Sequence, residues 1–431
     1  MSLFHTLLPY ARAVALVTLL WGPIAACTQP QPAQCVDELC PVGQACEDGR
    51  CAPLQVPTEL GDLGRFNAAA IDSEGHLVIA TYDSTHGNLV LWRESDDGAS
   101  TYILVDGFRV EEHAVVNTDS GLHPSLALAS DNSVHVAWYD AANTELRYAR
   151  IAEGEPWQIE TVNGQGPSDR GRHNALALDE KGRAYIAYRD DTARGLRYAV
   201  RSSSGLWDSK AISGCASEES CPDGTDENYG EYASLALIAG AARIAFYDRY
   251  RGDLKLASEN GVGEFTVTTL DGRDPESGID TGDVGRFSSL AVDPKRRLAV
   301  AYFDASGKSL RYLFEGSGSL VPQVIDSGIV EDASTGTLRS HIVGQHVELA
   351  FDSQGRAIML YLDATALVMK RAIVVGKQVV GTEFLPEIPA GSDIEFALTS
   401  EGAVKGVLGA WLENEAPRTR LETFELPPVQ P

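Results

Sequence analysis

One sequence unit occurs seven times along the chain, and this repetition limits the possible fold more than any other feature. Each copy opens with a glycine, then any residue, then in most copies an aromatic residue or a histidine. The opening glycines are Gly64, Gly121, Gly171, Gly230, Gly285, Gly344 and Gly391. Their spacing of 47 to 59 residues is the period of a four-stranded propeller blade.

The runs inside each copy have the character of strands. Each is about four to eight residues long, rich in Val, Ile, Tyr and Phe, and bounded by turn residues. Residues 184–188 (AYIAY), for example, are apolar on both faces, as expected for a strand covered on both sides by neighbouring sheets. The sequence therefore predicts an all-β fold, a seven-bladed β-propeller over residues 54–427.

The two ends of the repeat region predict how the ring closes. Residues 54–60 (LQVPTEL) precede the first copy and have the character of a fourth strand, whereas the last copy ends near Leu426 after its third. We expect the N-terminal strand to complete the last blade. Such closure removes exposed sheet edges, which otherwise promote aggregation.

Residues 1–26 have the features of an export signal. Arg12 is followed by an apolar stretch, residues 13–21, that is too short to span a bilayer. Residues 24–27 (IAAC) resemble the lipobox of bacterial lipoproteins, which implies cleavage before Cys27 and lipidation of that cysteine. Together with Thr28, the resemblance implies an outer-membrane lipoprotein of a Gram-negative cell envelope, facing the periplasm or the surface. An uncleaved anchor and an ordinary signal peptide are the alternatives.

The remaining six cysteines form two groups. After a Pro/Gln-rich tether at 27–34, the segment 35–53 has little apolar content and holds Cys35, Cys40, Cys46 and Cys51. In an exported chain these predict a small module with two disulfides of undetermined connectivity rather than a zinc site. It resembles the short Cys-rich inserts of some Gram-negative surface lipoproteins. Cys215 and Cys221 predict a disulfide within one long loop, which leaves no thiol for catalysis.

The formal net charge of −26 restricts the partners. Nucleic acids and anionic lipid surfaces bind clusters of Lys and Arg, so neither is expected to bind here. Membrane contact is expected through the lipid anchor alone. The composition fits a solvated extracytoplasmic monomer, or one that binds cations or basic partners.

Loop length predicts which face of the propeller carries function. The blade-to-blade connections at 106–121, 213–230, 271–285 and 326–344 are long, whereas the turns between first and second strands are short. Long loops are where binding residues commonly lie. We therefore expect the functional site on the face that carries the blade-to-blade connections.

The opening positions of the copies should surround the mouth of the central channel on that same face. Three of them are histidines, His123, His173 and His346, and three arginines precede such positions, Arg65, Arg172 and Arg286. Converging guanidinium groups could bind a carboxylate or another anion. Alternatively, each arginine pairs with a nearby strand-end acid such as Asp83, Asp190 or Asp304, and the histidines pack in a slot that other copies fill with Phe or Tyr.

Two sets of acidic residues each permit a structural and a functional interpretation. An acid ends the second run of every copy: Asp83, Asp140, Asp190, Asp248, Asp304, Asp363 and Glu413. These acids either cap tight turns or form a ring of ligands. Two loops collect oxygen donors of the kind that Ca²⁺ prefers, with candidate ligands Asp223, Asp226, Asn228, Asp280 and Asp283, although neither has EF-hand spacing.

The pattern from Leu176 to Ala199 resembles the repeats of bacterial sialidase-like (BNR-type) propellers, and the resemblance covers about 370 residues. It implies a site with an arginine triad, which Arg65, Arg172 and Arg286 could supply. The chain departs from that family in having seven copies and no Ser-x-Asp-x-Gly-x-Thr-Trp box, and no motif-matched position supplies its Tyr–Glu pair. We therefore expect a non-catalytic propeller that binds a protein or glycan, with no assigned catalytic residue and no cofactor other than possible calcium. The alternative is a sialidase-like glycan hydrolase or lyase acting at the channel mouth.

Overall fold

The structure is a computed structural model. It describes residues 44–47, 50–53, 60–95, 100–111, 114–163, 168–214, 228–261, 263–273, 277–316, 320–332, 334–411 and 419–429. Several predicted features lie outside these ranges. They are the signal segment, the lipidation site, the tether and residues 54–59 of the closing strand. Seven single residues also lie outside them: Cys35, Cys40, Cys215, Cys221, Asp223, Asp226 and Glu413. The chain divides into two compact units, Met1–Thr58 with Val110–Val116, and Glu59–Arg109 with Asn117–Pro431.

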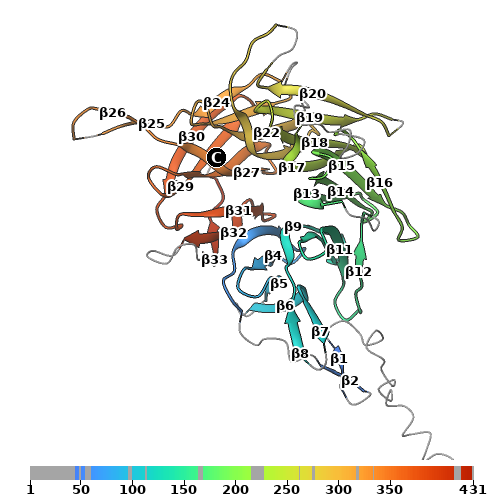
Figure 1. Cartoon of the computed structure of the whole chain (residues 1–431). Helices are drawn as coiled ribbons and strands as arrows, with labels where there is room; N and C mark the ends of the chain where they lie inside the picture. Colours follow the sequence, from blue (N-terminus) through green and yellow to red (C-terminus); the bar gives the residue numbers. More distant parts are fainter. Residues whose placement is uncertain are drawn as a thin grey trace, which may run out of the picture. The chain divides into compact units, whose positions relative to one another are not determined.

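The second unit contains seven antiparallel sheets in which strands follow one another in sequence order, as predicted for a seven-bladed propeller (Figure 1). The first strand of each blade contacts the first strands of both neighbouring blades, so these strands surround the axis. They are β3 (Arg65–Ile71), β9 (Ser120–Leu128), β13 (Arg170–Leu178), β17 (Tyr229–Ile238), β21 (Val284–Val292), β27 (Val343–Phe351) and β31 (Gly391–Leu398).

The second strands form the middle of each blade. They are β4 (Leu77–Asp83), β10 (Val134–Asp140), β14 (Ala184–Asp190), β18 (Ala241–Asp248), β22 (Leu298–Asp304), β28 (Arg356–Asp363) and β32 (Val404–Trp411). Every residue of β4, β10, β14 and β22 is buried, because neighbouring blades cover both faces of each sheet. The second strands are therefore apolar on both faces because both faces are covered, as the sequence predicted.

The third and fourth strands lie progressively further from the axis. The third strands are β5 (Asn88–Glu94), β11 (Glu145–Ile151), β15 (Gly195–Arg201), β19 (Asp253–Glu259), β23 (Ser309–Phe314), β29 (Val368–Val375) and β33 (Thr419–Leu426). The described fourth strands are β6 (Ser100–Asp106), β12 (Ile159–Thr161), β16 (Trp207–Ala211), β20 (Phe265–Asp271), β24 (Gln323–Asp326) and β30 (Gln378–Leu385). The seventh sheet has three described strands. Its completion by residues 54–60 therefore remains a prediction.

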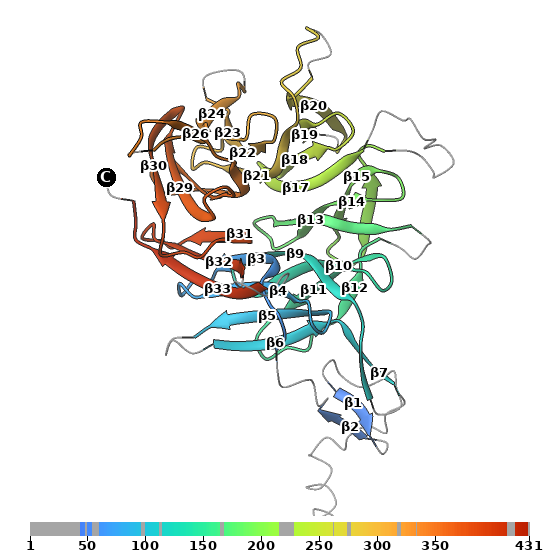
Figure 2. The ribbon, with the colours of Figure 1, turned by 60° about the vertical axis from the view of Figure 1, so that its left-hand side comes forward.

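The last blade packs directly against the first, so the ring is closed (Figure 2). The Asn67 amide donates a hydrogen bond to the Asp393 carbonyl at 2.8 Å, and the Thr419 hydroxyl donates to the Leu63 carbonyl at 3.1 Å. Lys405 of β32 and Glu94 of β5 form an ion pair at 3.0 Å. These contacts join segments more than three hundred residues apart.

The fourth strand of the second blade is short. Residues 157–162 (WQIETV) have the character of a strand, but β12 has three residues, Ile159–Thr161. Pro156 lacks an N–H and disfavours ladder pairing just before that strand.

Two of the long blade-to-blade connections contain hairpins. These pair β7 (Phe108–Glu111) with β8 (Ala114–Asn117) and β25 (Ile329–Glu331) with β26 (Leu338–Ser340).

The described part of the first unit includes a hairpin of β1 (Gln44–Glu47) and β2 (Arg50–Pro53). Cys46 lies opposite Cys51 in its register. The proposed two-disulfide module remains a prediction, since the other two cysteines lie outside the described residues. Within the described ranges no helix has the length and apolar character that crossing a bilayer requires.

Candidate functional site at the channel mouth

The opening position of every blade has the same unusual backbone. All seven residues adopt a left-handed conformation, with φ between 49° and 53°: Phe66, His123, His173, Tyr232, Phe287, His346 and Asp393. Each lies within a register shift between the first and second strands. Such a conformation costs about 1–2 kcal/mol in a non-glycine residue, so seven equivalent cases indicate a built feature of the repeat.

These bulges place six planar side chains in a ring, which we call the aromatic ring. Neighbouring ring centroids are 4.3 to 5.3 Å apart along the series Phe66, His123, His173, Tyr232, Phe287 and His346. Asp393 occupies the seventh position, and its backbone N–H donates to Nδ1 of His346 at 3.2 Å. The structure therefore brings the three predicted histidines together, and their role in ligand binding stays a prediction.

The histidines of the aromatic ring are uncharged near neutral pH. Burial, with help from nearby arginines, lowers the pKa of His173 to about 3. Burial also lowers the pKa of His346, and burial and the neighbouring His173 lower that of His123 well below its ordinary range. The histidines of the aromatic ring thus present neutral planar faces.

The predicted arginines Arg172 and Arg286 are paired within the protein. Nη2 of Arg172 donates to the Tyr139 hydroxyl at 3.1 Å, and it lies 3.5 Å from Oδ2 of Asp169. Arg286 repeats this arrangement with Asp283 at 2.6 Å, beside the hydroxyl of Tyr247. Arg65 lies opposite Tyr82 in the register of β3 and β4. Pairing with acids was therefore expected correctly for Arg172 and Arg286, but the expected strand-end partners such as Asp190 and Asp304 are wrong: Arg172 and Arg286 pair with Asp169 and Asp283, which directly precede their strands.

The tyrosine hydroxyls in these clusters lose their protons less readily than an ordinary tyrosine does. Tyr139 donates its hydroxyl to Asp169 at 2.7 Å, and Tyr247 donates to Asp283 at 2.8 Å. Burial raises the pKa of both to about 12, and the adjacent carboxylates act in the same direction. Neither hydroxyl is thus prepared to ionise near neutral pH.

A pair of glutamates, which sequence reasoning missed, lines the channel below the aromatic ring. Glu348 of β27 and Glu395 of β31 each lie two residues after the opening position, opposite Leu360 and Val407 respectively. The same register position in the other blades is a small residue, namely Ala68, Ser125, Ala175, Ser234 or Ser289. Comparing the copies two residues beyond the opening position would have revealed the pair.

Both glutamates retain a proton more strongly than an ordinary glutamate. Burial raises the pKa of Glu348 to about 7, and hydrogen bonds from Ser289 and the Leu349 backbone only partly oppose it. Burial raises the pKa of Glu395 well above its usual range, and the negative charges of Glu348 and Asp393 act in the same direction. Adjacent carboxyls that cannot both ionise are typical of sites that move protons.

A cavity of about 200 Å³ opens at this mouth. The six planar side chains of the aromatic ring line it, together with Asn67, Pro124, Asn174, Ala233, Asp393 and Glu395. It is smaller than a typical site for a drug-sized ligand, roughly 300–1,000 Å³. Its dimensions suit one small polar group, such as a single sugar ring, rather than a long side chain.

The strand-end acids are turn caps. Asp83, Asp140, Asp190, Asp248, Asp304 and Asp363 are each at most 1% exposed, and Oδ1 of each accepts a hydrogen bond from an amide of the following turn. The second oxygen of each lies within 4 Å of a basic side chain. The capping interpretation therefore accounts for all six described positions.

The described calcium candidates already have partners. Asp283 pairs with Arg286, the side-chain oxygen of Asn228 accepts from Arg189 at 2.7 Å, and Asp280 accepts from the Gly282 N–H. Among the described residues, the one group of three metal-ligating side chains is Asp72, Glu74 and His76 in the β3–β4 turn. Arginine pairs with the equivalent aspartate in three other blades, so His76 occupies the place of an ion-pair partner. Calcium binding at the two loops remains a prediction.

Comparison with known proteins identifies the fold. No protein-family model matches the chain. No curated protein matches its sequence. Among solved structures, the polysaccharide lyase Uly1 has a TM-score of 0.53 at 12% identity, covering 89% of this chain and 93% of its own.

Two further solved structures are similar. A puromycin hydrolase has a TM-score of 0.50 at 14% identity, over 86% of this chain and 54% of that protein. An α-L-arabinanase of Penicillium chrysogenum has a TM-score of 0.46 at 13% identity, over 86% of this chain and 99% of that protein. Fold and comparisons define the class: the protein is a seven-bladed β-propeller.

Proposed function

We propose that the propeller is a glycan hydrolase that acts at its channel mouth. The observation that carries this proposal is the cavity in which Asp393 and Glu395 lie beside a ring of six planar side chains. It corresponds to the alternative reading of the sequence rather than to the non-catalytic one.

The aromatic ring suits a sugar. Planar side chains stack against the C–H faces of a sugar ring, while imidazole nitrogens and the Tyr232 hydroxyl can form hydrogen bonds with its hydroxyl groups. The half-buried state of these side chains keeps them accessible to a ligand. A terminal sugar could therefore enter the cavity with the rest of its chain outside.

The carboxyls can supply acid–base chemistry. Most glycosidases use one carboxylic acid, kept protonated by its surroundings, and one carboxylate. In our proposal Glu395 gives its proton to the glycosidic oxygen as the C–O bond breaks. The Asp393 carboxylate accepts a proton from the water that attacks the anomeric carbon. Burial keeps Glu395 protonated, and the negative charges of Glu348 and Asp393 add to this effect.

The surroundings favour hydrolysis over elimination. A lyase removes a proton beside a uronate carboxyl, so it needs a base and cations that neutralise that carboxylate. Here Arg172 and Arg286 are paired with aspartates, and the neighbouring tyrosines hold their protons. This pairing equally favours the second candidate function, glycan capture without chemistry.

The test is release of new reducing ends from a panel of polysaccharides by the full chain. We expect turnover by the wild-type protein and a loss of at least about a hundredfold in Glu395→Gln, the scale of general acid catalysis. Glu401→Gln, an exposed glutamate of the β31–β32 turn, is the matched control and should be unaffected. Wild-type binding without turnover would leave glycan capture, and unchanged turnover in Glu395→Gln would overturn the assignment.

We also propose that the chain is an outer-membrane lipoprotein anchored through Cys27, on the sequence features of residues 1–28. Metabolic labelling with a fatty acid analogue tests this directly. Label should appear in the wild-type chain and disappear in Cys27→Ser. Label that persists in the variant, or never appears, would contradict the anchor.

A further inference from the structure

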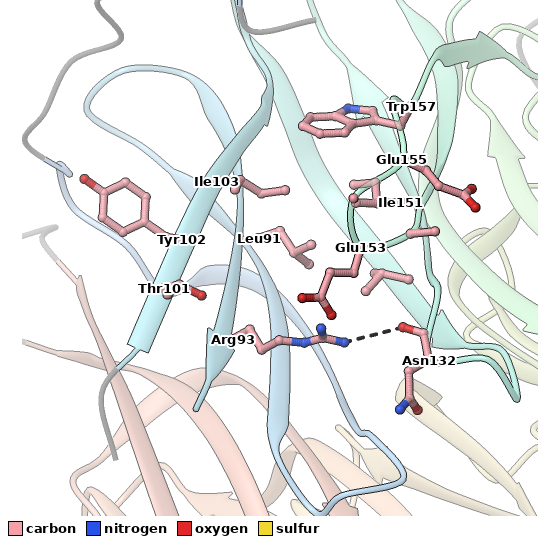
Figure 3. A pocket seen from close by; sticks show the side chains of 13 residues that line it. Leu91, Arg93, Thr101, Tyr102, Ile103, Asn132, Ile151, Glu153, Glu155 and Trp157 are labelled. Atoms are coloured by element: carbon pink, nitrogen blue, oxygen red, sulfur yellow. Dashed lines mark hydrogen bonds between the residues drawn. The ribbon is translucent and has the colours of Figure 1, made fainter. Parts of the chain in front are cut away.

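A second cavity lies between the first and second blades, at the end of the propeller that carries the short turns. We call it the blade 1–2 groove. It has a volume of about 440 Å³ and lies between strands β5 and β6 on one side and the β11–β12 segment on the other (Figure 3). Its walls include Leu91, Ile103, Ile151 and Trp157, with Arg93 and Glu153 among them.

The equivalent place between the second and third blades is filled. There Nε1 of Trp207 donates to Glu160 at 2.8 Å, and Arg201 forms two hydrogen bonds to the same carboxylate at 2.7 and 2.9 Å. The Tyr148 ring packs edge-on against the indole, with centroids 5.0 Å apart. Every polar group that this indole brings is thereby satisfied within the protein.

Strand register shows what changes in the blade 1–2 groove. Leu91 lies opposite Ile103 as Tyr148 lies opposite Glu160 in the next blade. Ile151 is separated from Trp157 by the same number of residues as Arg201 is from Trp207, so Ile151 corresponds to Arg201. Tyrosine, glutamate and arginine are thus replaced by leucine and two isoleucines, and the indole alone is kept.

The retained indole lacks its partner. Nε1 of Trp157 is buried and has no hydrogen-bond partner among the described residues. An unsatisfied buried donor costs about 1–3 kcal/mol, which a ligand with an acceptor oxygen beside Ile103 could recover. The groove therefore has an unfilled volume and an unmet hydrogen bond in one place.

The polar side chains of the groove restrict the ligand further. Among the described residues, the contacts of Arg93 are long, 3.4 Å to the Asn132 carbonyl and 3.9 Å to Asp72. Glu153 is exposed, and Figure 3 shows its carboxylate in the same part of the groove as the Arg93 guanidinium. The groove thus offers a strong donor and a strong acceptor beside an apolar wall.

We propose that the blade 1–2 groove binds one unit of a neutral carbohydrate. A sugar hydroxyl can accept from Arg93 or Trp157 and also donate to Glu153, while its C–H face packs on the isoleucines. An anionic ligand would meet Glu153 and Glu155, and an apolar peptide side chain would leave the donors unpaired in a desolvated site. This site stands apart from the channel, so it does not depend on the proposed hydrolysis.

The test is calorimetric titration of the full chain with neutral oligosaccharides, uronic-acid oligosaccharides and an apolar peptide as separate probes. The variant Leu91→Tyr/Ile103→Glu/Ile151→Arg copies the filled junction, and Trp157→Phe is a milder alternative if that variant fails to fold. We expect neutral oligosaccharides to bind, with affinity reduced about tenfold or more in both variants. Glu395→Gln reports on the channel, and the exposed Glu401→Gln is the control that should leave this binding unchanged.

Several results would overturn the proposal. These are no heat with neutral oligosaccharides at millimolar concentration, unchanged affinity in both groove variants, or binding of the acidic probe or the peptide alone. Loss of neutral binding in Glu395→Gln, but not in the groove variants, would assign the ligand to the channel. Loss of turnover without loss of groove binding would affect the proposed hydrolase alone.

Discussion

The two ends of the propeller both carry acidic residues, but the surroundings give these residues opposite properties. At the short-turn end, burial acts to raise the pKa of Asp293, yet hydrogen bonds from the Arg297 side chain and backbone outweigh it and lower the pKa. At the channel mouth, burial raises the pKa of Glu348 and Glu395, and no ion pair joins either to a cation among the described residues. The comparison shows that the supply of hydrogen-bond donors, rather than residue type, decides whether the pKa of a buried carboxyl is lowered or raised.

The largest expected loss of stability comes from removing a buried strand-end carboxylate that accepts hydrogen bonds and forms an ion pair. Asp304 is fully buried, accepts from the Gly307 N–H at 2.6 Å, and pairs with Arg311 at 2.6 Å. Asp304→Ala should lower the free energy of unfolding by about 3–5 kcal/mol, because it leaves the Gly307 amide and the partly buried Arg311 cation without that partner. Denaturant unfolding measures this, with exposed Asp280→Ala as control. Equal small effects in both variants would contradict the capping role.

The aromatic ring should make the propeller sensitive to acid. His173 has a folded-state pKa of about 3 against an ordinary 6.5, so the folded state resists the proton that the unfolded chain accepts. Stability is full above the ordinary pKa and falls with pH below it, by about 2–3 kcal/mol near pH 4.5. His173→Phe, which copies Phe66 and Phe287, should remove most of this loss. Identical thermal unfolding of both proteins across this range would contradict it.

Glu348 should act in the opposite pH window. Its folded-state pKa of about 7 exceeds the ordinary 4.5, so its contribution is fully present below about 4.5 and is lost as pH rises towards 7. Glu348→Gln should therefore be more stable than the wild type at neutral pH, on the order of 2 kcal/mol, and similar to it in acid. Thermal unfolding between these values checks the sign, with Glu401→Gln as the surface control. A destabilised variant at neutral pH would break the comparison.

The smallest effect is expected at the surface of the short-turn end. Arg183 is 50% exposed and pairs with Asp179 at 3.1 Å, a turn-end ion pair that solvent screens. Arg183→Ala should change the free energy of unfolding by about 0.5 kcal/mol or less. A loss of stability as large as that of Asp304→Ala would show that exposed ion pairs at these turns contribute as much to the free energy of unfolding as the buried acids do.

The fold was predictable because the sequence pattern of one blade occurs seven times along the chain. Apolar runs such as 184–188, the opening glycines and the strand-end acids each follow from the geometry of one blade. The left-handed backbone at the opening positions was not predictable, because bulky residues such as Phe287 and Tyr232 normally avoid it. Only the packing of seven bulged strands around one axis imposes it.

The sites were harder to predict than the fold. Arg172 and Arg286 attract attention in the sequence, but their partners Asp169 and Asp283 lie in connections whose course the repeat does not determine. No local motif distinguishes Glu348 and Glu395 from other glutamates. Strand register shows that both lie on the channel wall. The blade 1–2 groove depends on three aliphatic residues, Leu91, Ile103 and Ile151, that are separated in the sequence, so no local motif predicts it.

Titration of the glutamate side chains by carboxyl-carbon NMR tests the central claim most directly. Two resonances, assigned through their absence in Glu348→Gln and Glu395→Gln, should titrate as a coupled pair with apparent pKa values at or above about 7. If both instead titrate near the ordinary glutamate value of 4.5, the channel mouth holds two solvated carboxylates and the proposed acid is absent.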